Sequence, residues 1–68
     1  MIQGYGRFIC VNGIYYEGEF NNGYFDGKGK YVFESGKFYE GEFKNGKFHG
    51  WGILSDNNGL ILKQGNWT

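Results

Sequence analysis

The chain repeats itself at a period of 23 residues, and this repeat is the feature that most constrains its fold. Residues 16–29 read YEGEFNNGYFDGKG, and residues 39–52 read YEGEFKNGKFHGWG. When both blocks are extended, to residues 38 and 61, 11 of 23 positions are identical. Glycines 4, 6 and 13 continue the same spacing toward the amino terminus. Such self-similarity is typical of an array in which one supersecondary unit stacks on copies of itself.

Helix signals are nearly absent, whereas aromatic and β-branched residues alternate with polar residues between clusters that contain glycine. We therefore predict an all-β fold, a single-layer antiparallel meander of about three stacked β-hairpins. The strands are expected at residues 5–11, 14–20, 28–34, 37–43, 51–56 and 60–67. Short hairpin turns are expected at residues 12–13, 35–36 and 58–59, and longer linkers at 21–27 and 44–50.

Alternation along these strands places aromatic side chains on one face of the sheet and charged side chains on the other. The aromatic face is predicted to pack its rings together and to offer exposed contacts for a partner from Tyr16, Phe20, Tyr31, Phe33, Tyr39 and Phe43. The structural glycines, whose bare backbone we expect neighbouring rings to cover, are Gly18, Gly29, Gly41 and Gly52. Phe8 and Cys10 are expected on the same face.

On the charged face, opposite charges are expected to lie across from or near one another on neighbouring strands. Lys28 and Lys30 fall near Glu40 and Glu42, and Arg7 falls near Glu17 and Glu19. Turn length leaves the pairing open by two residues. Each facing pair of opposite charges favours the pairing by about 0.2–1 kcal/mol.

The block YEGEFKNGKFHGWG resembles the MORN repeat, whose pattern is Tyr-x-Gly, then Gly, His-Gly-x-Gly and a further Gly. The resemblance covers about residues 4–61. It divides the chain into a partial repeat, 1–15, two repeats, 16–38 and 39–61, and a degenerate terminal strand, 62–68. Asp26 and Gln3 stand where the pattern has His49, and no Tyr leads the last unit.

Composition limits the domain and its chemistry. The 68 residues form one small domain, and a single cysteine and a single histidine exclude an internal disulfide and argue against a zinc site. The net charge of zero argues against a nucleic-acid partner and supports membrane-lipid binding only weakly. The sequence shows neither an apolar run of about 20 residues nor a signal peptide, so we expect a cytoplasmic protein.

Three motifs suggest chemistry, and each has a structural explanation. The spacing Gly41-x4-Gly46-Lys47 imitates a phosphate-binding loop, but Phe48 stands where Ser or Thr would meet magnesium. His49 belongs to the His-Gly turn of the repeat, and Cys10 is expected to be a packed hydrophobe. We therefore predict no catalytic residues, no cofactor, no metal and no enzymatic activity.

These features predict a non-catalytic protein–protein interaction or scaffold module within a multi-protein complex. Other proteins are expected to contact its aromatic face and an open sheet edge, because neither terminal strand carries a polar cap. The resemblance implies a structural component of a ciliary or axonemal complex, or of another cytoskeletal assembly. A phospholipid-associating module and an accessory regulatory domain of an enzyme complex remain open as alternatives.

Overall fold

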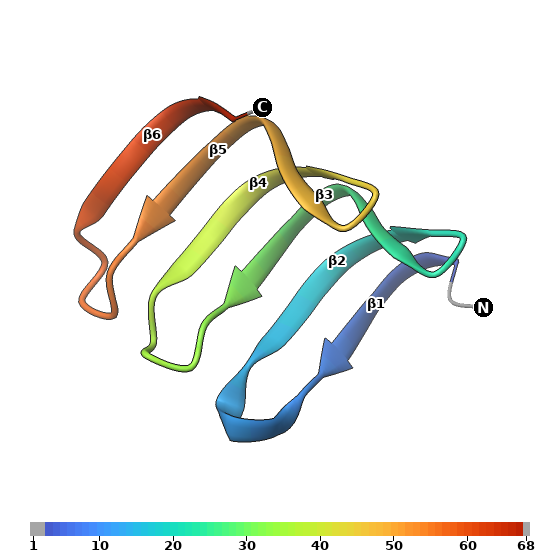
Figure 1. Ribbon diagram of the computed structural model, residues 1–68, viewed down its shortest axis with the longest axis horizontal. Coiled ribbons are helices and arrows are strands. Elements are labelled where there is room, and N and C mark those ends of the chain that lie inside the picture. Colours follow the sequence, from blue (N-terminus) through green and yellow to red (C-terminus); the bar gives the residue numbers. More distant parts are fainter. Residues whose placement is uncertain (1–2, 68) are drawn as a thin grey trace.

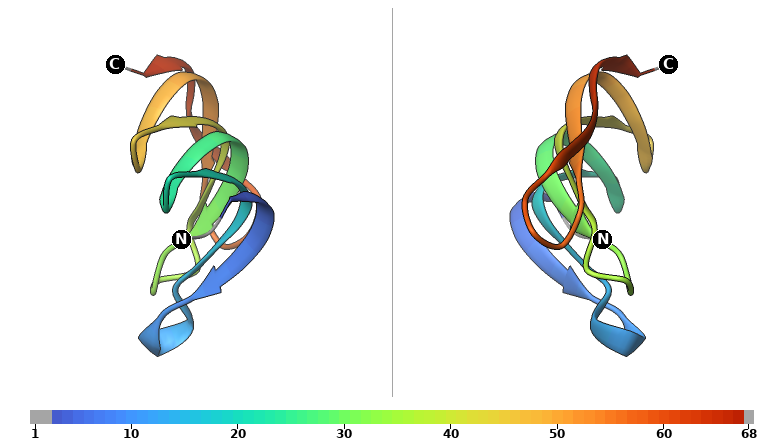
Figure 2. Two further views of the ribbon diagram at one scale, coloured as in Figure 1. Left: turned by 90° about the vertical axis from the view of Figure 1, so that its right-hand side faces the viewer. Right: turned by 90° about the vertical axis from the view of Figure 1, so that its left-hand side faces the viewer.

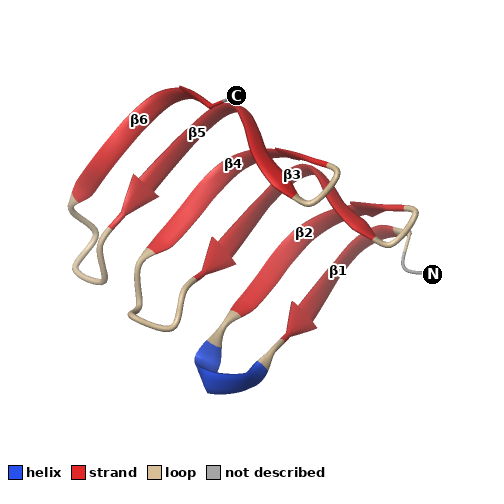
Figure 3. Ribbon diagram, viewed as in Figure 1, coloured by secondary structure: helices blue, strands red, loops and turns tan. Residues whose placement is uncertain are grey.

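A computed structural model of the chain describes residues 3–67, which form one antiparallel sheet of six strands (Figure 1). The strands lie side by side in chain order: β1 (Gly4–Ile9), β2 (Tyr15–Asn21), β3 (Tyr24–Val32), β4 (Phe38–Lys44), β5 (Lys47–Ser55) and β6 (Ile61–Trp67). A 3-10 turn, Val11–Gly13, joins β1 to β2 and is the one helical segment in the described part of the chain (Figure 3). The predicted all-β meander is confirmed.

Tight Asn-Gly turns join β2 to β3 and β4 to β5. Asn22 and Asn45 have φ of 55° and 52°, and the glycine after each has φ of 82°. Positive φ at both central residues is the requirement of a type I′ hairpin turn. The interpretation of residues 21–27 and 44–50 as longer linkers is therefore wrong, and β3 and β5 begin at residues 24 and 47 rather than 28 and 51.

The other hairpins close through wider loops. Residues 33–37 separate β3 from β4, and residues 56–60 separate β5 from β6. In the second loop, one carboxylate oxygen of Asp56 accepts hydrogen bonds from the backbone N–H groups of Asn58 and Leu60, at 2.9 and 2.8 Å. The expected turn at 12–13 thus falls in the 3-10 turn, and those at 35–36 and 58–59 fall within these two loops; all three connections are longer than predicted.

A row of glycines crosses the sheet from edge to edge, with one glycine on each strand. In strand order the row is Gly6, Gly18, Gly29, Gly41, Gly52 and Gly65. A β-carbon built on Gly18 would lie 2.5 Å from the carbonyl oxygen of Lys28, and one on Gly41 would lie 2.5 Å from the α-carbon of Gly52. Because these neighbours are backbone atoms, only glycine fits at these two positions.

Strands β3 and β5 each contain a bulge between the glycine row and the Asn-Gly turn. On β2, Gly18 and Phe20 are two residues apart, whereas their partners on β3, Gly29 and Phe25, are four residues apart. The register between β4 and β5 shifts in the same way. Extra residues in one strand of a pair bend the strand and increase its twist. The turn ends of these two hairpins therefore bend over one face, which we call the inner face (Figures 1 and 2).

The core lies on the inner face and is almost wholly aromatic. Its buried side chains are Tyr16, Phe20, Tyr39 and Phe43, between 0 and 4% exposed. The bent segments cover them: Phe25 stacks on Tyr16 with ring centroids 3.9 Å apart, and Phe48 stacks on Tyr39 at 4.1 Å. The first residues of β3 and β5, which follow the two Asn-Gly turns, thus supply the second layer that a single sheet needs to form a dry core.

The two buried tyrosines connect the glycine row to the bulges. A β-carbon on Gly29 would contact the Tyr16 ring, 2.5 Å from its Cε1, so that ring lies against bare backbone. The Tyr16 hydroxyl donates a hydrogen bond to the carbonyl oxygen of Glu19 at 2.8 Å, and Tyr39 donates in the same way to Glu42. Both glutamates lie where the register shifts, so each hydroxyl bonds a carbonyl at the point where the regular ladder is interrupted.

Burial, followed by the nearby Glu19 carboxylate, raises the pKa of Tyr16 from 10.0 to about 12. Burial and Glu42 also raise the pKa of Tyr39. The two hydroxyls therefore remain protonated, and able to donate, well above neutral pH.

The charged face has the predicted pairing of strands. Arg7 lies opposite Glu17, and Lys30 lies opposite Glu40. The Arg7 guanidinium contacts the Glu17 carboxylate at 3.2 Å, whereas the Lys30 ammonium lies 4.6 Å from the centre of the Phe38 ring. Arg7 and Glu40 are exposed and Glu17 and Lys30 are half-buried, so these charge pairs contribute little to stability.

Replacing Gly41 by valine is expected to lower the melting temperature strongly. The new side chain collides with the backbone of β5, which cannot move without breaking the sheet. Thermal unfolding followed by circular dichroism measures the effect. Glu40→Val is the matched control, because it adds the same side chain to the adjacent exposed position on the other face. Equal melting temperatures for the Gly41→Val and Glu40→Val variants would contradict the packing described.

The raised pKa of Tyr16 predicts a loss of stability in alkali. Its contribution is complete below pH 10, the pKa of the unfolded state, and is lost as the pH rises from 10 to about 12. A difference of two pKa units corresponds to about 3 kcal/mol. Urea unfolding of the wild type and of Tyr16→Phe at pH 8, 10 and 11.5 tests this.

The phenylalanine variant is expected to be less stable at pH 8 by about 1–3 kcal/mol, because the Glu19 carbonyl loses its donor. The difference should shrink as the pH rises. Parallel loss of stability in both proteins would show that the Tyr16 hydroxyl does not titrate as described.

Candidate functional site

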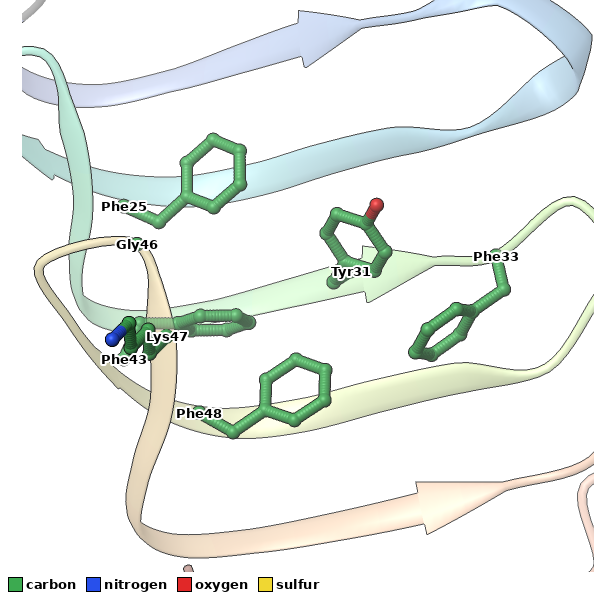
Figure 4. Close-up of a pocket in the computed structure, with 7 residues that line it drawn as sticks. All are labelled: Phe25, Tyr31, Phe33, Phe43, Gly46, Lys47 and Phe48. Carbon is green, nitrogen blue, oxygen red and sulfur yellow. The ribbon is translucent and has the colours of Figure 1, made fainter. Parts of the chain in front are cut away.

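An aromatic groove opens on the inner face between the two complete repeats. It has a volume of about 450 Å³ and is open to solvent. The lining residues, shown in Figure 4, are Phe25, Tyr31, Phe33, Phe43, Gly46, Lys47 and Phe48. Its lining is more apolar than that of two other depressions on the described surface, one beside Trp51 and one beside His49.

The period of the chain places the walls of this groove. Phe25 and Phe48 are 23 residues apart and follow equivalent Asn-Gly turns, so they stand on either side of the groove. Tyr31 lies between them on β3, with its ring centre 6.2 Å from that of Phe25 and 6.3 Å from that of Phe48. Phe33 forms the far end, 5.0 Å from Tyr31.

The rings that line the groove are held by one another. Phe43 lies at the floor and meets Phe25 and Phe48 edge to face, with centroids 6.1 and 5.6 Å apart. Such edge-to-face contacts favour particular ring orientations. The groove is therefore preorganised, and Lys47 adds one cationic group at its margin. It can accept apolar side chains from a segment that also presents a carboxylate.

Two of the six aromatic residues predicted to contact a partner lie accessibly in this groove. Tyr31 and Phe33 are half-buried and line it. The expectation that the other four offer exposed ring surface is wrong, because Tyr16, Phe20, Tyr39 and Phe43 are the buried core. Contact of a partner with Tyr31 or Phe33 stays a prediction.

Phe25, Lys47 and Phe48 are site residues that the sequence prediction missed. It assigned them to linkers and therefore did not place them on a face. Two signals could have found the phenylalanines: both recur at the period of 23, and both follow an Asn-Gly pair that predicts a tight turn.

Cys10 and His49 lie outside the groove. The prediction that Cys10 is packed on the aromatic face is wrong, because its side chain is exposed. It follows the end of β1 and precedes the 3-10 turn, where strand alternation no longer applies. His49 is exposed on the bulged part of β5 and borders a second depression together with Asp26 and Glu42.

Between residues 3 and 67, no three His, Cys, Asp or Glu side chains gather closely enough to hold a metal ion. The same span contains no helix with the length and apolar character needed to cross a membrane.

Comparison with known families agrees with the repeat geometry. The family model for the MORN repeat matches the chain at residues 1–15, 16–38 and 39–61. The resemblance noted from the tyrosine and glycine spacing is thereby confirmed. A comparison with curated proteins found no match.

Truncation of the two kinds of groove residue is expected to affect stability differently. Phe48→Ala should lower the free energy of unfolding by about 3–5 kcal/mol, since it uncovers the Tyr39 ring. Phe33→Ala should cost much less, because the ring neighbours of Phe33 are the half-buried Tyr31 and Phe48 rather than a buried tyrosine. Urea unfolding measures both free energies. Similar losses for the two variants would contradict the conclusion that Phe48 covers a buried core ring and Phe33 does not.

Proposed function

Because the chain belongs to the MORN-repeat family, we propose that it is a non-catalytic protein–protein interaction module whose inner-face groove binds a segment of a partner protein. MORN repeats are generally associated with protein or membrane interaction. The observation that carries the protein alternative is the groove itself, an open apolar concavity lined by five aromatic rings. Rigid aromatic side chains in such concave sites contribute most of the energy in many interfaces.

Charge favours a protein partner over a phospholipid surface. An anionic bilayer attracts clusters of several Lys and Arg residues. Here the groove carries one cation, Lys47, and on the opposite face the bases of neighbouring strands alternate with acids, as Arg7 does with Glu17. A segment with apolar side chains and one carboxylate matches the rings and Lys47 together.

The wider role that we propose is structural. The module would act as a cytoplasmic scaffold part of a multi-protein complex, such as a ciliary or axonemal complex or another cytoskeletal assembly. The support for this role is the family resemblance and the neutral repeat-built sheet with two edge strands. Regulation of an enzyme complex is the alternative, with the same groove as the contact.

Peptides selected from a random library on the wild-type protein test the groove. Their affinities are then measured by calorimetry for two variants, Phe33→Ala in the groove and Trp51→Ala on the opposite face. Trp51 is a matched control, because it is an aromatic residue of the same sheet and is 50% exposed. Binding should weaken at least about tenfold for Phe33→Ala and remain unchanged for Trp51→Ala.

Circular dichroism must show that both variants remain folded. The opposite ranking of the variants, or a library without groove binders, would reject the groove as the site. Sedimentation with anionic vesicles is the second measurement. Strong binding that collapses with salt would replace the protein partner by a membrane as the primary target.

A further inference from the structure

The free edge of β1 repeats the geometry of an internal strand. Residues Gly4–Ile9 correspond, at the period of 23, to residues 27–32 of β3 and 50–55 of β5. On one side, β3 pairs with the YEGEF segment of β2, and β5 pairs with the identical segment of β4. Within the described residues, β1 has no such neighbour and pairs with β2 alone.

We propose that the free edge of β1 is a binding site for an antiparallel strand of sequence Tyr-Glu-Gly-Glu-Phe from a partner protein. This site is separate from the aromatic groove and does not depend on it. Strand addition to a sheet edge is a known mode of recognition in which main-chain hydrogen bonds supply affinity. Specificity comes from the positions on the edge that receive particular side chains of the added strand, which we call seats.

The first seat is the backbone at Gly4. Its φ is +87°, close to the +98° of Gly27 and the +72° of Gly50. At those two counterparts a β-carbon would meet the carboxylates of Glu19 and Glu42, with Glu19 Oε1 at 3.0 Å from the position on Gly27. At Gly4 nothing lies within 4 Å. The backbone at Gly4 therefore has the conformation that Gly27 and Gly50 adopt beside a carboxylate. The second glutamate of the incoming strand would supply that carboxylate at Gly4.

The second seat is the end of the glycine row. Gly6 is the edge member of the row, opposite Gly18. By the register of β2 on β3, the glycine of an added strand would lie opposite Gly6 and its tyrosine opposite Phe8. The tyrosine ring would then cover Gly6 as Tyr16 covers Gly29. Phe8 is 44% exposed, so the surface of its ring is available to contact the incoming tyrosine.

The third seat is a charge. Arg7 is the counterpart of Lys30, which lies between Glu17 on one side and Glu40 on the other. Arg7 contacts Glu17, and its side chain is still 58% exposed. The first glutamate of the incoming segment would face Arg7 from the open side.

The opposite edge of the sheet, formed by β6, carries different side chains from the β1 edge. On β6 the position of the core tyrosine is taken by Lys63, which lies opposite Leu54. The Lys63 ammonium lies 4.5 Å from the centre of the Trp67 ring, and the Trp67 indole donates to the carbonyl of Gly52 at 3.1 Å. A second copy of this chain would therefore offer β1 a strand without the required tyrosine, and its β2 and β4 are already paired on both sides. The occupant that fits is therefore a Tyr-Glu-Gly-Glu-Phe strand that does not come from the described residues of this chain or of a second copy.

The test is a titration of the ¹⁵N-labelled chain with a synthetic peptide of sequence KFYEGEFKN, copied from residues 37–45. Saturable amide shifts are expected in Gly4–Ile9, together with slower hydrogen exchange there. A short peptide loses conformational freedom on binding, so millimolar concentrations are appropriate. Control peptides carry alanine for the tyrosine, or valine for the glycine, and should bind at least about tenfold more weakly.

A charge exchange supplies a second test. Arg7→Glu in the protein should weaken binding of the peptide. Lysine in place of the first glutamate of the peptide should restore binding to this variant. Amide dispersion shows whether the variant is folded, and the control peptides test the seats without any change to the protein. Absence of shifts in β1, equal binding of the valine peptide, or shifts confined to β6 or to the groove would overturn the proposal. Because Tyr31 and Phe33 report the groove separately, either site can fail alone.

Discussion

The contact of a tyrosine ring with a bare glycine backbone is the interaction on which the rest of this structure depends. Tyr16 lies on Gly29, and Tyr39 lies on Gly52. Each hydroxyl then reaches a carbonyl beside a bulge. One side chain thereby holds two strands and the bend between them. A side chain at either glycine would displace the ring, uncover the core and leave the buried hydroxyl without its acceptor.

The bend explains how so small a chain obtains a core. A single-layer sheet exposes both faces, and a domain of this size buries little apolar surface. Bending the turn ends over the inner face places Phe25 and Phe48 on the two tyrosines, so the sheet covers itself. The space between the Phe25 ring and the Phe48 ring remains open. The aromatic groove is this space, so the same bend that forms the core also produces a candidate binding surface.

The same logic separates the two edges. An array of this kind grows when a strand with the leading tyrosine is laid on the edge of its neighbour. The β6 edge replaces that tyrosine with Lys63 and closes over it with Trp67. The β1 edge keeps the glycine row and the positive φ of Gly4. One end therefore carries a polar substitute in its tyrosine seat, whereas the other retains seats for a further strand.

The sequence alone determined the all-β class, the number of strands, the face of the glycines and the placement of Arg7 and Lys30 near acids, because these follow from alternation and from the period. Which aromatics are buried was decided only by the tertiary structure. Alternation assigns a side chain to a face, but it does not report what covers that face. A bulge changes the number of residues between paired positions without changing the residue pattern, so the bend that buries Tyr39 and exposes the groove between Phe25 and Phe48 appears only when both strands are paired in space.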